Sequence, residues 1–194
     1  MPLTPVAAGM VATIVTSLEM TQRPTLRPLS AVPFRLERWK SPAPDKYRVL
    51  FRRVGEPWLW FSRLVMGDQE LSAIIHDPAV EIYAVRDRHG IEIGMLELDF
   101  RRDGEVEISF FGLIRELTGK GHGNWLMGQA LALSWRAGVK RIWLHSCTLD
   151  HAGALGFYRK HGFVAFARAV EAFADPRLAG ILDRAAAPHI PVIG

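Results

Sequence analysis

The sequence contains a single cysteine, no cluster of basic residues among aromatic ones, and no long apolar run. A lone Cys147 excludes an intrachain disulfide framework and is typical of proteins from reducing compartments. The lack of a basic and aromatic block argues against a nucleic-acid-binding surface. The apolar start, Val6 to Leu18, has no basic segment before it and is interrupted by Thr and Ser, so it resembles neither a signal peptide nor a membrane span. We therefore expect a cytoplasmic protein that binds neither nucleic acid nor a membrane.

The overall composition is that of an ordinary globular domain. With 194 residues, of which 49% are hydrophobic and 23% charged, the chain is long enough for one domain with a full core. The net charge of +4 favours anionic ligands only weakly. No internal repeat is visible. The composition leaves the oligomeric state undetermined, and a homodimer is compatible with it.

A glycine-rich loop organises the middle of the chain. The apolar run Ile108 to Phe111 precedes it, the loop reads Thr-Gly-Lys-Gly-His-Gly-Asn at residues 118–124, and a helical spacing of apolar residues follows from Leu126. This order predicts a strand, a tight loop and a helix. The first N–H groups of such a helix have no partner within the helix, and together with the helix dipole they form a binding site for phosphate oxygens.

The glycine spacing differs from two common nucleotide-binding motifs. It is not a Walker A loop, because Gly119 is not followed at the required spacing by Gly-Lys-Ser or Gly-Lys-Thr. The spacing of Gly119, Gly121 and Gly123 does not match the dinucleotide fingerprint either. By itself the loop is equally compatible with a plain tight turn.

A second motif lies downstream, at residues 150–163, and reads Asp-His-Ala-Gly-Ala-Leu-Gly-Phe-Tyr-Arg-Lys-His-Gly-Phe. Together with Thr118 to Gly123, it resembles the paired signatures of the GNAT superfamily, the acyl-CoA-dependent N-acyltransferases. The resemblance covers roughly residues 80–173. Two positions depart from the family pattern: Thr118 stands where the family usually carries Gln or Arg, and His151 stands where it commonly carries Asn.

The order of predicted elements indicates an α/β (α+β) fold with three layers: a mixed central sheet that contains an antiparallel meander, and flanking helices. Strands are expected at 47–54, 81–86, 91–100, 105–111, 141–145 and 163–173, and helices at 58–66, 69–76 and 126–137 and around 151–161. A hairpin turn is expected at 87–90, and Asp68 and Asp150 are expected to cap the helices that follow them. We interpret residues 1–46 as an N-terminal extension with one extra strand at 11–16 and otherwise loop. Residues 47–175 form the GNAT-like domain, and residues 176–194 are a C-terminal appendage of one or two helical turns.

The resemblance implies that acetyl-CoA binds at the glycine loop and that coenzyme A is the product. It also implies that backbone groups near Phe111 and Leu113 bind the pantetheine arm and polarise the thioester carbonyl. The residues expected to bind acetyl-CoA are Phe111, Leu113, Thr118, Gly119, Lys120, Gly121, His122, Gly123, Asn124, His151 and Tyr158. For Lys120 and His122, simple solvent exposure is the alternative interpretation.

Acyl transfer to an amine requires a base and benefits from an acid that protonates the thiolate. The resemblance places Tyr158 near the sulfur of coenzyme A, where its phenol is the expected acid. Some family members carry their base at the position of Glu107, and burial would raise the pKa of a carboxyl there. A solvated face shared by Glu105 and Glu107 is the alternative, and Asp99 is the rival carboxylate on the acceptor side.

The acceptor is expected to bind beside the first helices, as the resemblance implies. Trp58, Trp60 and Arg63 lie in this region, and an aromatic wall with one Arg suits an acceptor with an apolar part and a carboxylate. Core packing of the two tryptophans and a surface ion pair for Arg63 form the alternative interpretation. Cys147 is more simply a buried small side chain than a nucleophile.

The leading hypothesis is an enzyme, an N-acetyltransferase that transfers the acetyl group of acetyl-CoA to a primary amine by direct attack in a ternary complex. The acceptor is a small-molecule amine or a peptide. A non-catalytic acyl-CoA-binding module on the same fold is the alternative that the departures at Thr118 and His151 leave open. An unrelated nucleotide-binding domain is disfavoured because no acidic ribose ligand or Mg²⁺ site is recognisable. No metal ligand set is expected.

Overall fold

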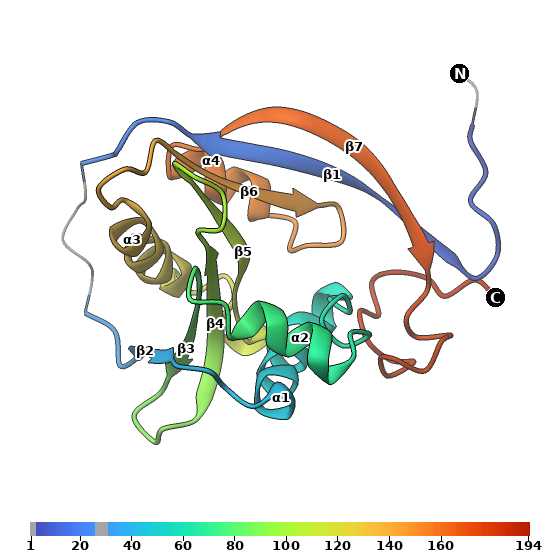
Figure 1. Ribbon diagram of the computed structural model, residues 1–194. Helices are drawn as coiled ribbons and strands as arrows, with labels where there is room; N and C mark the ends of the chain where they lie inside the picture. Colours follow the sequence, from blue (N-terminus) through green and yellow to red (C-terminus); the bar gives the residue numbers. More distant parts are fainter. Residues whose placement is uncertain (1–2, 26–30) are drawn as a thin grey trace.

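The computed structural model describes residues 3–25 and 31–194, which build one mixed sheet flanked by helices. Within these residues the sheet has seven strands in the order β2-β3-β4-β5-β6-β1-β7 (Figure 1). The strands are β1 Met10–Met20, β2 Arg35–Trp39, β3 Val80–Arg86, β4 Glu92–Asp99, β5 Glu105–Leu113, β6 Arg141–Cys147 and β7 Val164–Ala174. The helices are α1 Pro44–Gly55, α2 Asp68–Ile75, α3 His122–Ser134 and α4 Ala154–Lys160, with short 3₁₀ turns η1 Glu56–Trp58 and η2 Arg115–Leu117. The predicted α/β three-layer class is confirmed.

Helices cover both faces of the sheet where it is most apolar. Tyr47, Leu50, Phe51 and Val54 of α1 pack on one face, with Ile82 of β3 among their neighbours. The buried side chains of α3 pack on the opposite face against strands β3 to β6. The almost continuous burial of β3 and β4 follows from this double cover.

The antiparallel meander is confirmed. β3 pairs with β4, and β4 with β5, in antiparallel register. The predicted turn at residues 87–90 closes through Asp87, whose side-chain oxygen accepts hydrogen bonds from the N–H groups of His89 and Ile91. Gly90 adopts a φ of 83°, a conformation that glycine reaches without strain.

Three predictions about residues 35–68 are wrong. Residues 47–54 form helix α1 and no strand, because the buried side chains recur at helical spacing and Pro44 stands in the first turn. Residues 58–66, expected as a helix, form only the end of η1 followed by turns. Asp68 is the first residue of α2 and Gly67 its N-cap, so Asp68 does not cap the helix.

The region before α1 holds more strand than expected. The run at 11–16 lies within β1, which is paired with β6 on one side and β7 on the other. β2, at 35–39, was expected as loop and pairs with β3 at the edge of the sheet. The part of this predicted loop at residues 26–30 lies outside the described residues. Because β1 is an interior strand, residue 46 does not mark a structural boundary.

Residues 175–194 form turns without a regular helix, contrary to the one or two helical turns expected. Arg177 organises this segment: its guanidinium binds the Asp175 carboxylate at 2.7 Å and donates to the carbonyl groups of Ala186 and Ile190. Both members of the Arg177–Asp175 pair are buried. The segment packs beside the end of β7 and against Leu59 (Figure 1).

Candidate active site

A cleft opens where β5 and β6 separate. The two parallel strands pair only from Glu105 to Glu107 with Arg141 to Trp143, although β5 continues to Leu113 and β6 to Cys147. The strands diverge beyond this point (Figure 1). A pocket of about 640 Å³ lies there, lined by β5, β6, the glycine loop, α4, the segment after η1 and β7. Every second N–H and C=O of the unpaired part of β5 points toward this opening, because strand backbone groups alternate in direction.

The glycine loop forms one end of the cleft. Gly121 is the N-cap of α3 with a φ of 83°, Gly119 has a φ of 77°, and a Cβ on either would meet nothing within 4 Å. Within residues 3–25 and 31–194, the N–H groups of residues 119–123 donate no hydrogen bond. These donors and the helix dipole fit a phosphate group. The Thr118 hydroxyl donates to the carbonyl of Ile114 within its own turn.

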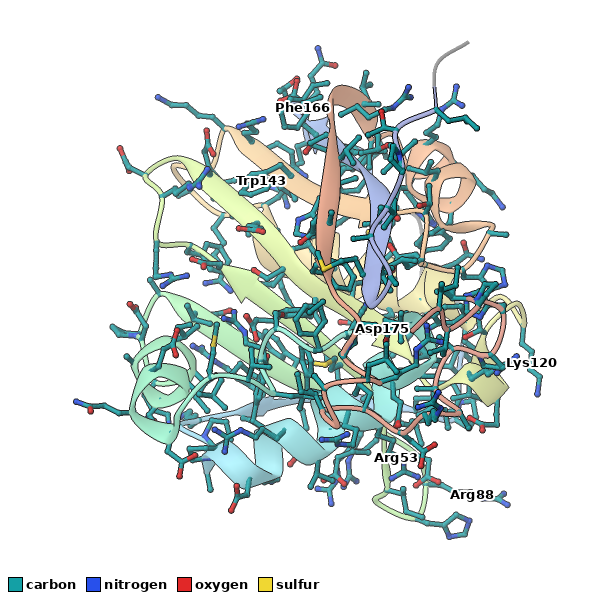
Figure 2. The ribbon with its side chains drawn as sticks, turned by 90° about the vertical axis from the view of Figure 1, so that its right-hand side faces the viewer. Arg53, Arg88, Lys120, Trp143, Phe166 and Asp175 are labelled. Carbon is teal, nitrogen blue, oxygen red and sulfur yellow. The ribbon has the colours of Figure 1, made fainter. Side chains whose placement is uncertain are left out.

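Three other side chains of the loop do not line the cleft. Lys120 is exposed and extends from the periphery of the molecule (Figure 2). His122 packs edge-on against Phe34 with ring centroids 4.9 Å apart. The side chain of Asn124 lies 3.0 Å from the imidazole nitrogen of His161. The site therefore presents backbone, and not these side chains, to a ligand.

Helix α4 brings Tyr158 into the cleft beside Phe111. The two rings lie 6.2 Å apart, and both line the pocket. Burial raises the pKa of the Tyr158 hydroxyl well above its ordinary value, and the negative charge of Asp150 raises it further. The phenol thus keeps its proton throughout the neutral range and is available as a donor.

Asp150 does not cap α4, contrary to expectation. Its carboxylate accepts hydrogen bonds from the Ser146 hydroxyl at 2.7 Å and from the Cys147 N–H at 3.0 Å, at the end of β6. The next residue, His151, accepts a hydrogen bond from the N–H of Gly153 and packs edge-on against Trp58. His151 therefore stands in the cleft wall between the two predicted ligand regions.

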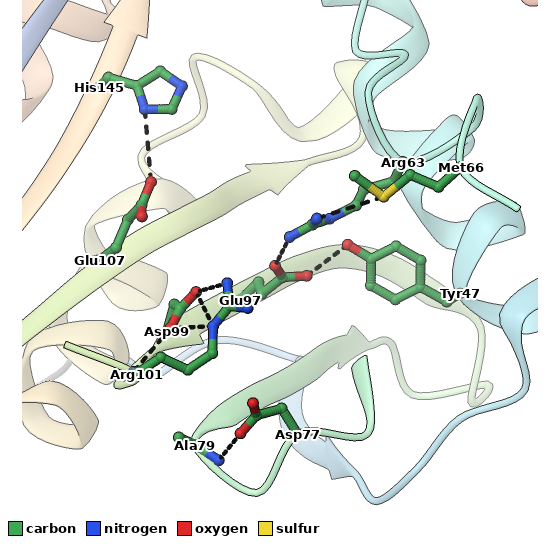
Figure 3. A network of polar contacts seen from close by, with 10 residues as sticks. All are labelled: Tyr47, Arg63, Met66, Asp77, Ala79, Glu97, Asp99, Arg101, Glu107 and His145. Carbon is green, nitrogen blue, oxygen red and sulfur yellow. Dashed lines mark hydrogen bonds and ion pairs between the residues drawn. The ribbon is translucent and has the colours of Figure 1, made fainter. Parts of the chain in front are cut away.

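Glu107 and His145 lie on the neighbouring strands β5 and β6, and only His145 lines the cleft. Burial raises the pKa of the Glu107 carboxyl, and nearby His145 partly offsets this effect. The Glu107 carboxylate lies 3.8 Å from Nδ1 of His145, and of the two only His145 lines the pocket (Figure 3). Sequence reasoning missed His145, although the alternation of β6, with Ile142 and Leu144 on the core side, would have placed His145 on the opposite face.

Arg63 is buried and does not line the cleft. Its guanidinium binds the fully buried Glu97 carboxylate at 2.7 Å, and the Tyr47 hydroxyl donates to the same carboxylate at 2.5 Å (Figure 3). Burial and the charge of Glu97 raise the pKa of Tyr47 well above its ordinary value, so this hydroxyl stays protonated. Both oxygens of the Glu97 carboxylate thus accept a hydrogen bond inside the face covered by α1, whereas Nε of Arg63 has no hydrogen-bond partner among the described residues. The interpretation of Arg63 as part of a surface ion pair is therefore wrong, and its role in acceptor binding stays a prediction.

Asp99 also lies outside the cleft lining. Burial acts to raise the pKa of its carboxyl, but the hydrogen bonds from Arg101 outweigh burial, and the net shift is downward (Figure 3). A carboxylate held ionised by a guanidinium is a weak base. The geometry does not support Asp99 as the rival to Glu107.

Both predicted tryptophans line the cleft. Trp60 packs against Phe51 and Phe110, so it belongs to the core and to the cleft wall at once. It passes so close to Gly55 that a Cβ there would lie 2.4 Å from Trp60, which explains the glycine. Trp58 lies between the imidazole rings of His151 and His189, and the latter belongs to the C-terminal segment.

The described part of the chain lacks two features, a membrane-spanning helix and a cluster of metal ligands. No helix in it is both long enough and apolar enough to cross a membrane. No group of three or more His, Cys, Asp or Glu side chains in residues 3–25 and 31–194 is arranged to hold a metal ion.

Solved structures share this architecture. A GCN5-related N-acetyltransferase from Sphaerobacter thermophilus is 18% identical, superposes with a TM-score of 0.60 and covers 84% of this chain, which spans 51% of that protein. An aminoglycoside acetyltransferase from an uncultured soil metagenomic sample is 14% identical, with a TM-score of 0.55, covering 67% of this chain and 88% of its own. An IAA acetyltransferase from Bacillus cereus is 18% identical, with a TM-score of 0.52 and coverage of 69% and 79%. No curated protein matches the sequence.

These likenesses define the class as an acetyltransferase-like α/β fold. The model of the acetyltransferase (GNAT) family matches residues 39–163, well over half of the chain. The protein therefore belongs to the GNAT family, a family of acyltransferases that use acetyl-CoA as cosubstrate.

Proposed function

We propose that the protein transfers the acetyl group of acetyl-CoA to an amine by direct attack within a ternary complex. The cleft between β5 and β6 supports this most, because it joins a phosphate-binding loop at one end to an aromatic wall at the other. In the reaction a C–N bond forms and the C–S bond breaks. One proton leaves the amine, and one proton is taken up by the departing thiolate.

The chain's own backbone would hold the acyl donor. The free N–H groups of residues 119–123 suit the phosphates, and the open φ of Gly121 lets the backbone approach them. The unpaired edge of β5 beside Phe111 and Leu113 offers alternate N–H and C=O groups to an extended amide-containing arm. One N–H of this edge is the proposed donor to the thioester oxygen, which gains charge during attack.

Glu107 and His145 would accept the proton of the amine together. The His145 imidazole lines the cleft, and the Glu107 carboxylate lies 3.8 Å from its Nδ1, so a proton taken from the amine could be shared between the two side chains. Tyr158, whose pKa is raised by burial, would protonate the thiolate. In this proposal Cys147 does not carry the acyl group. Burial and the charge of Asp150 raise the pKa of its thiol, which makes the thiol a poor nucleophile.

An acetyl-CoA binding experiment with two matched glycine variants tests this proposal. Gly121 and Gly138 both have a positive φ, 83° and 89°, and a Cβ on either meets nothing within 4 Å, but only Gly121 belongs to the loop. Gly121→Val and Gly138→Val should therefore carry a similar backbone strain. At 100 Kd, acetyl-CoA should stabilise the wild type by about 2.7 kcal/mol in thermal unfolding. Gly138→Val should keep this shift, and Gly121→Val should lose it.

Turnover decides between an enzyme and a binding module. The wild type and Gly138→Val should both release free coenzyme A only when an amine is added. Glu107→Gln and His145→Gln should each lose roughly 10²–10⁴-fold in kcat with the acetyl-CoA shift unchanged. The alternative outcome is that acetyl-CoA stabilises the protein against heat but no amine in a broad panel causes release of coenzyme A. The protein would then be a non-catalytic acyl-CoA-binding module.

A further inference from the structure

Glu171 is an acidic side chain of the cleft that the proposed chemistry does not use. It lies on β7 opposite Thr13 of β1, and it lines the pocket two residues before Phe173. Its side chain is exposed at the rim. Within the described part of the chain, no residue forms a hydrogen bond or an ion pair with the Glu171 carboxylate. Of the two carboxylates that line the cleft, Asp150 accepts hydrogen bonds from Ser146 and Cys147, whereas Glu171 has no partner among the described residues.

The cleft lining has no Lys or Arg side chain, among the described residues, that could bind a negatively charged group of the acceptor. The guanidinium of Arg63 lies 5.3 Å from the ring of Phe110, which lines the cleft, but it is bound to Glu97. An acceptor carboxylate would therefore lose its hydration without gaining a cationic partner. The lining of the cleft therefore gives no support to an acceptor that carries a carboxylate.

The register of the strands separates Glu171 from the reacting centre. His145 pairs with Ser17 of β1, and Glu171 pairs with Thr13. These positions differ by four residues along β1, or about 13 Å, and β1 itself lies between β6 and β7. Phe61 and Phe173, whose rings lie 4.9 Å apart, line the space on the Glu171 side. A ligand that contacts both ends must have an apolar body of several bonds.

We propose that the acceptor carries a second cationic group, separated by an apolar body from the amine that is acetylated, and that Glu171 binds this second cation. The inference deepens the proposed acetyl transfer and rests on it. A diamine or polyamine, or a cationic ligand with an apolar core, has this chemistry. Amino acids and other amines with a terminal carboxylate are disfavoured acceptors.

Three amines of equal chain length test the charge at the far end. Octylamine, 1,8-diaminooctane and 8-aminooctanoic acid differ only in carrying no group, an ammonium or a carboxylate there. Release of coenzyme A at saturating acetyl-CoA gives kcat/KM for each. After division by two for its two equivalent nitrogens, the diamine should exceed octylamine by roughly two- to fivefold, as for an exposed ion pair. The amino acid should lie at least about tenfold below the diamine, because its carboxylate faces Glu171.

Glu171→Gln is the decisive variant, and Glu70→Gln is its control. Glu70 is an exposed carboxylate on α2 that does not line the cleft. In Glu171→Gln the corrected preference for the diamine over octylamine should fall to about one. Glu70→Gln should keep the wild-type preference. Higher salt should weaken the preference of the wild type for the diamine, because salt screens the attraction between Glu171 and the second cation.

Binding measured without turnover separates the two proposals. With coenzyme A present, the diamine should stabilise the wild type against heat more than octylamine does, and Glu171→Gln should abolish the difference. A wild type that prefers 8-aminooctanoic acid, or a diamine preference that survives in Glu171→Gln, would overturn the second cation while leaving acetyl transfer intact. A protein that neither turns over any amine nor binds these probes would overturn both.

Discussion

The two halves of the sheet differ in how completely their strands are covered. β3 and β4 are buried along almost their whole length between α1 and α2 on one face and α3 on the other. β7 forms the opposite edge, and ten of its eleven residues are exposed. The cleft lies where the covered half and the open half separate. The buried strands β3 and β4 therefore contribute most to stability, whereas the strands of the open half are accessible to a ligand.

The acidic residues of the two halves show the same contrast. Glu97 in the covered half is fully buried and bound by both Arg63 and Tyr47. Near the cleft, the only ion-pair partner of Glu107 is the imidazole of His145, 3.8 Å away, among the described residues. Glu171 has no hydrogen-bond or ion-pair partner among these residues. A buried charge that is fully paired is explained by structure, whereas a carboxylate left incompletely paired at a cleft is a candidate for chemistry. The predictions below test this distinction.

The largest effect is expected from breaking the paired charge. Arg63→Ala leaves the Glu97 carboxylate buried without its cation, which should cost about 3–5 kcal/mol in the free energy of unfolding. Arg101→Ala is the control, because its pair with Asp99 is more exposed and should cost less than about 1 kcal/mol. Urea denaturation measures both. A stable Arg63→Ala variant with a raised KM for the acceptor would restore Arg63 to the acceptor site.

Tyr158→Phe should affect the rate and leave the fold intact. The change keeps the ring that packs against Phe111 and removes only the hydroxyl, so kcat should fall roughly 10²–10⁴-fold with little change in acetyl-CoA binding. The loss should shrink with an acyl donor whose thiol is more acidic, since that thiolate needs less protonation. A loss that is independent of the leaving group would show that the hydroxyl positions the donor.

Glu107→Gln should make the protein more stable at neutral pH while it impairs catalysis. Burial raises the pKa of this carboxyl in the folded state, so ionised Glu107 costs stability above that raised value. Below the ordinary pKa of a glutamate, about 4.3, the carboxyl is protonated in both states and the cost disappears. Thermal unfolding should therefore show a gain from Glu107→Gln at pH 7 that is absent near pH 4. A loss of stability at pH 7 would mean that the carboxylate is structurally paired.

The smallest effect is expected in the open half. Ile14 on β1 is 44% exposed, and Ile82 on β3 is 1% exposed. Ile14→Ala should change the free energy of unfolding by no more than about 0.5 kcal/mol, whereas Ile82→Ala should cost about 2–5 kcal/mol. Equal costs for the two variants would mean that the open edge of the sheet is covered in solution by something outside the described chain.

Elements with a strong local pattern could be predicted from the sequence. The meander strands, the loop with Gly121 and the helix after it follow from alternation, turn residues and glycine chemistry, all of which act within a few residues. The prediction at residues 47–54 failed because a short apolar run fits a strand and a buried helix equally. β2 was missed because it is a five-residue edge strand among prolines.

The sequence alone determined the family resemblance, the position of the loop and the presence of Tyr158 in the second motif, because each is a local pattern of residue types. Only the tertiary structure decided which charges meet. Arg63 and Glu97 are separated by 34 residues, Glu107 and His145 belong to different strands, and β1 lies between strands from the far end of the chain. Pairing, burial and the shape of the cleft depend on contacts between distant segments, and those contacts arise from burying the whole apolar surface at once.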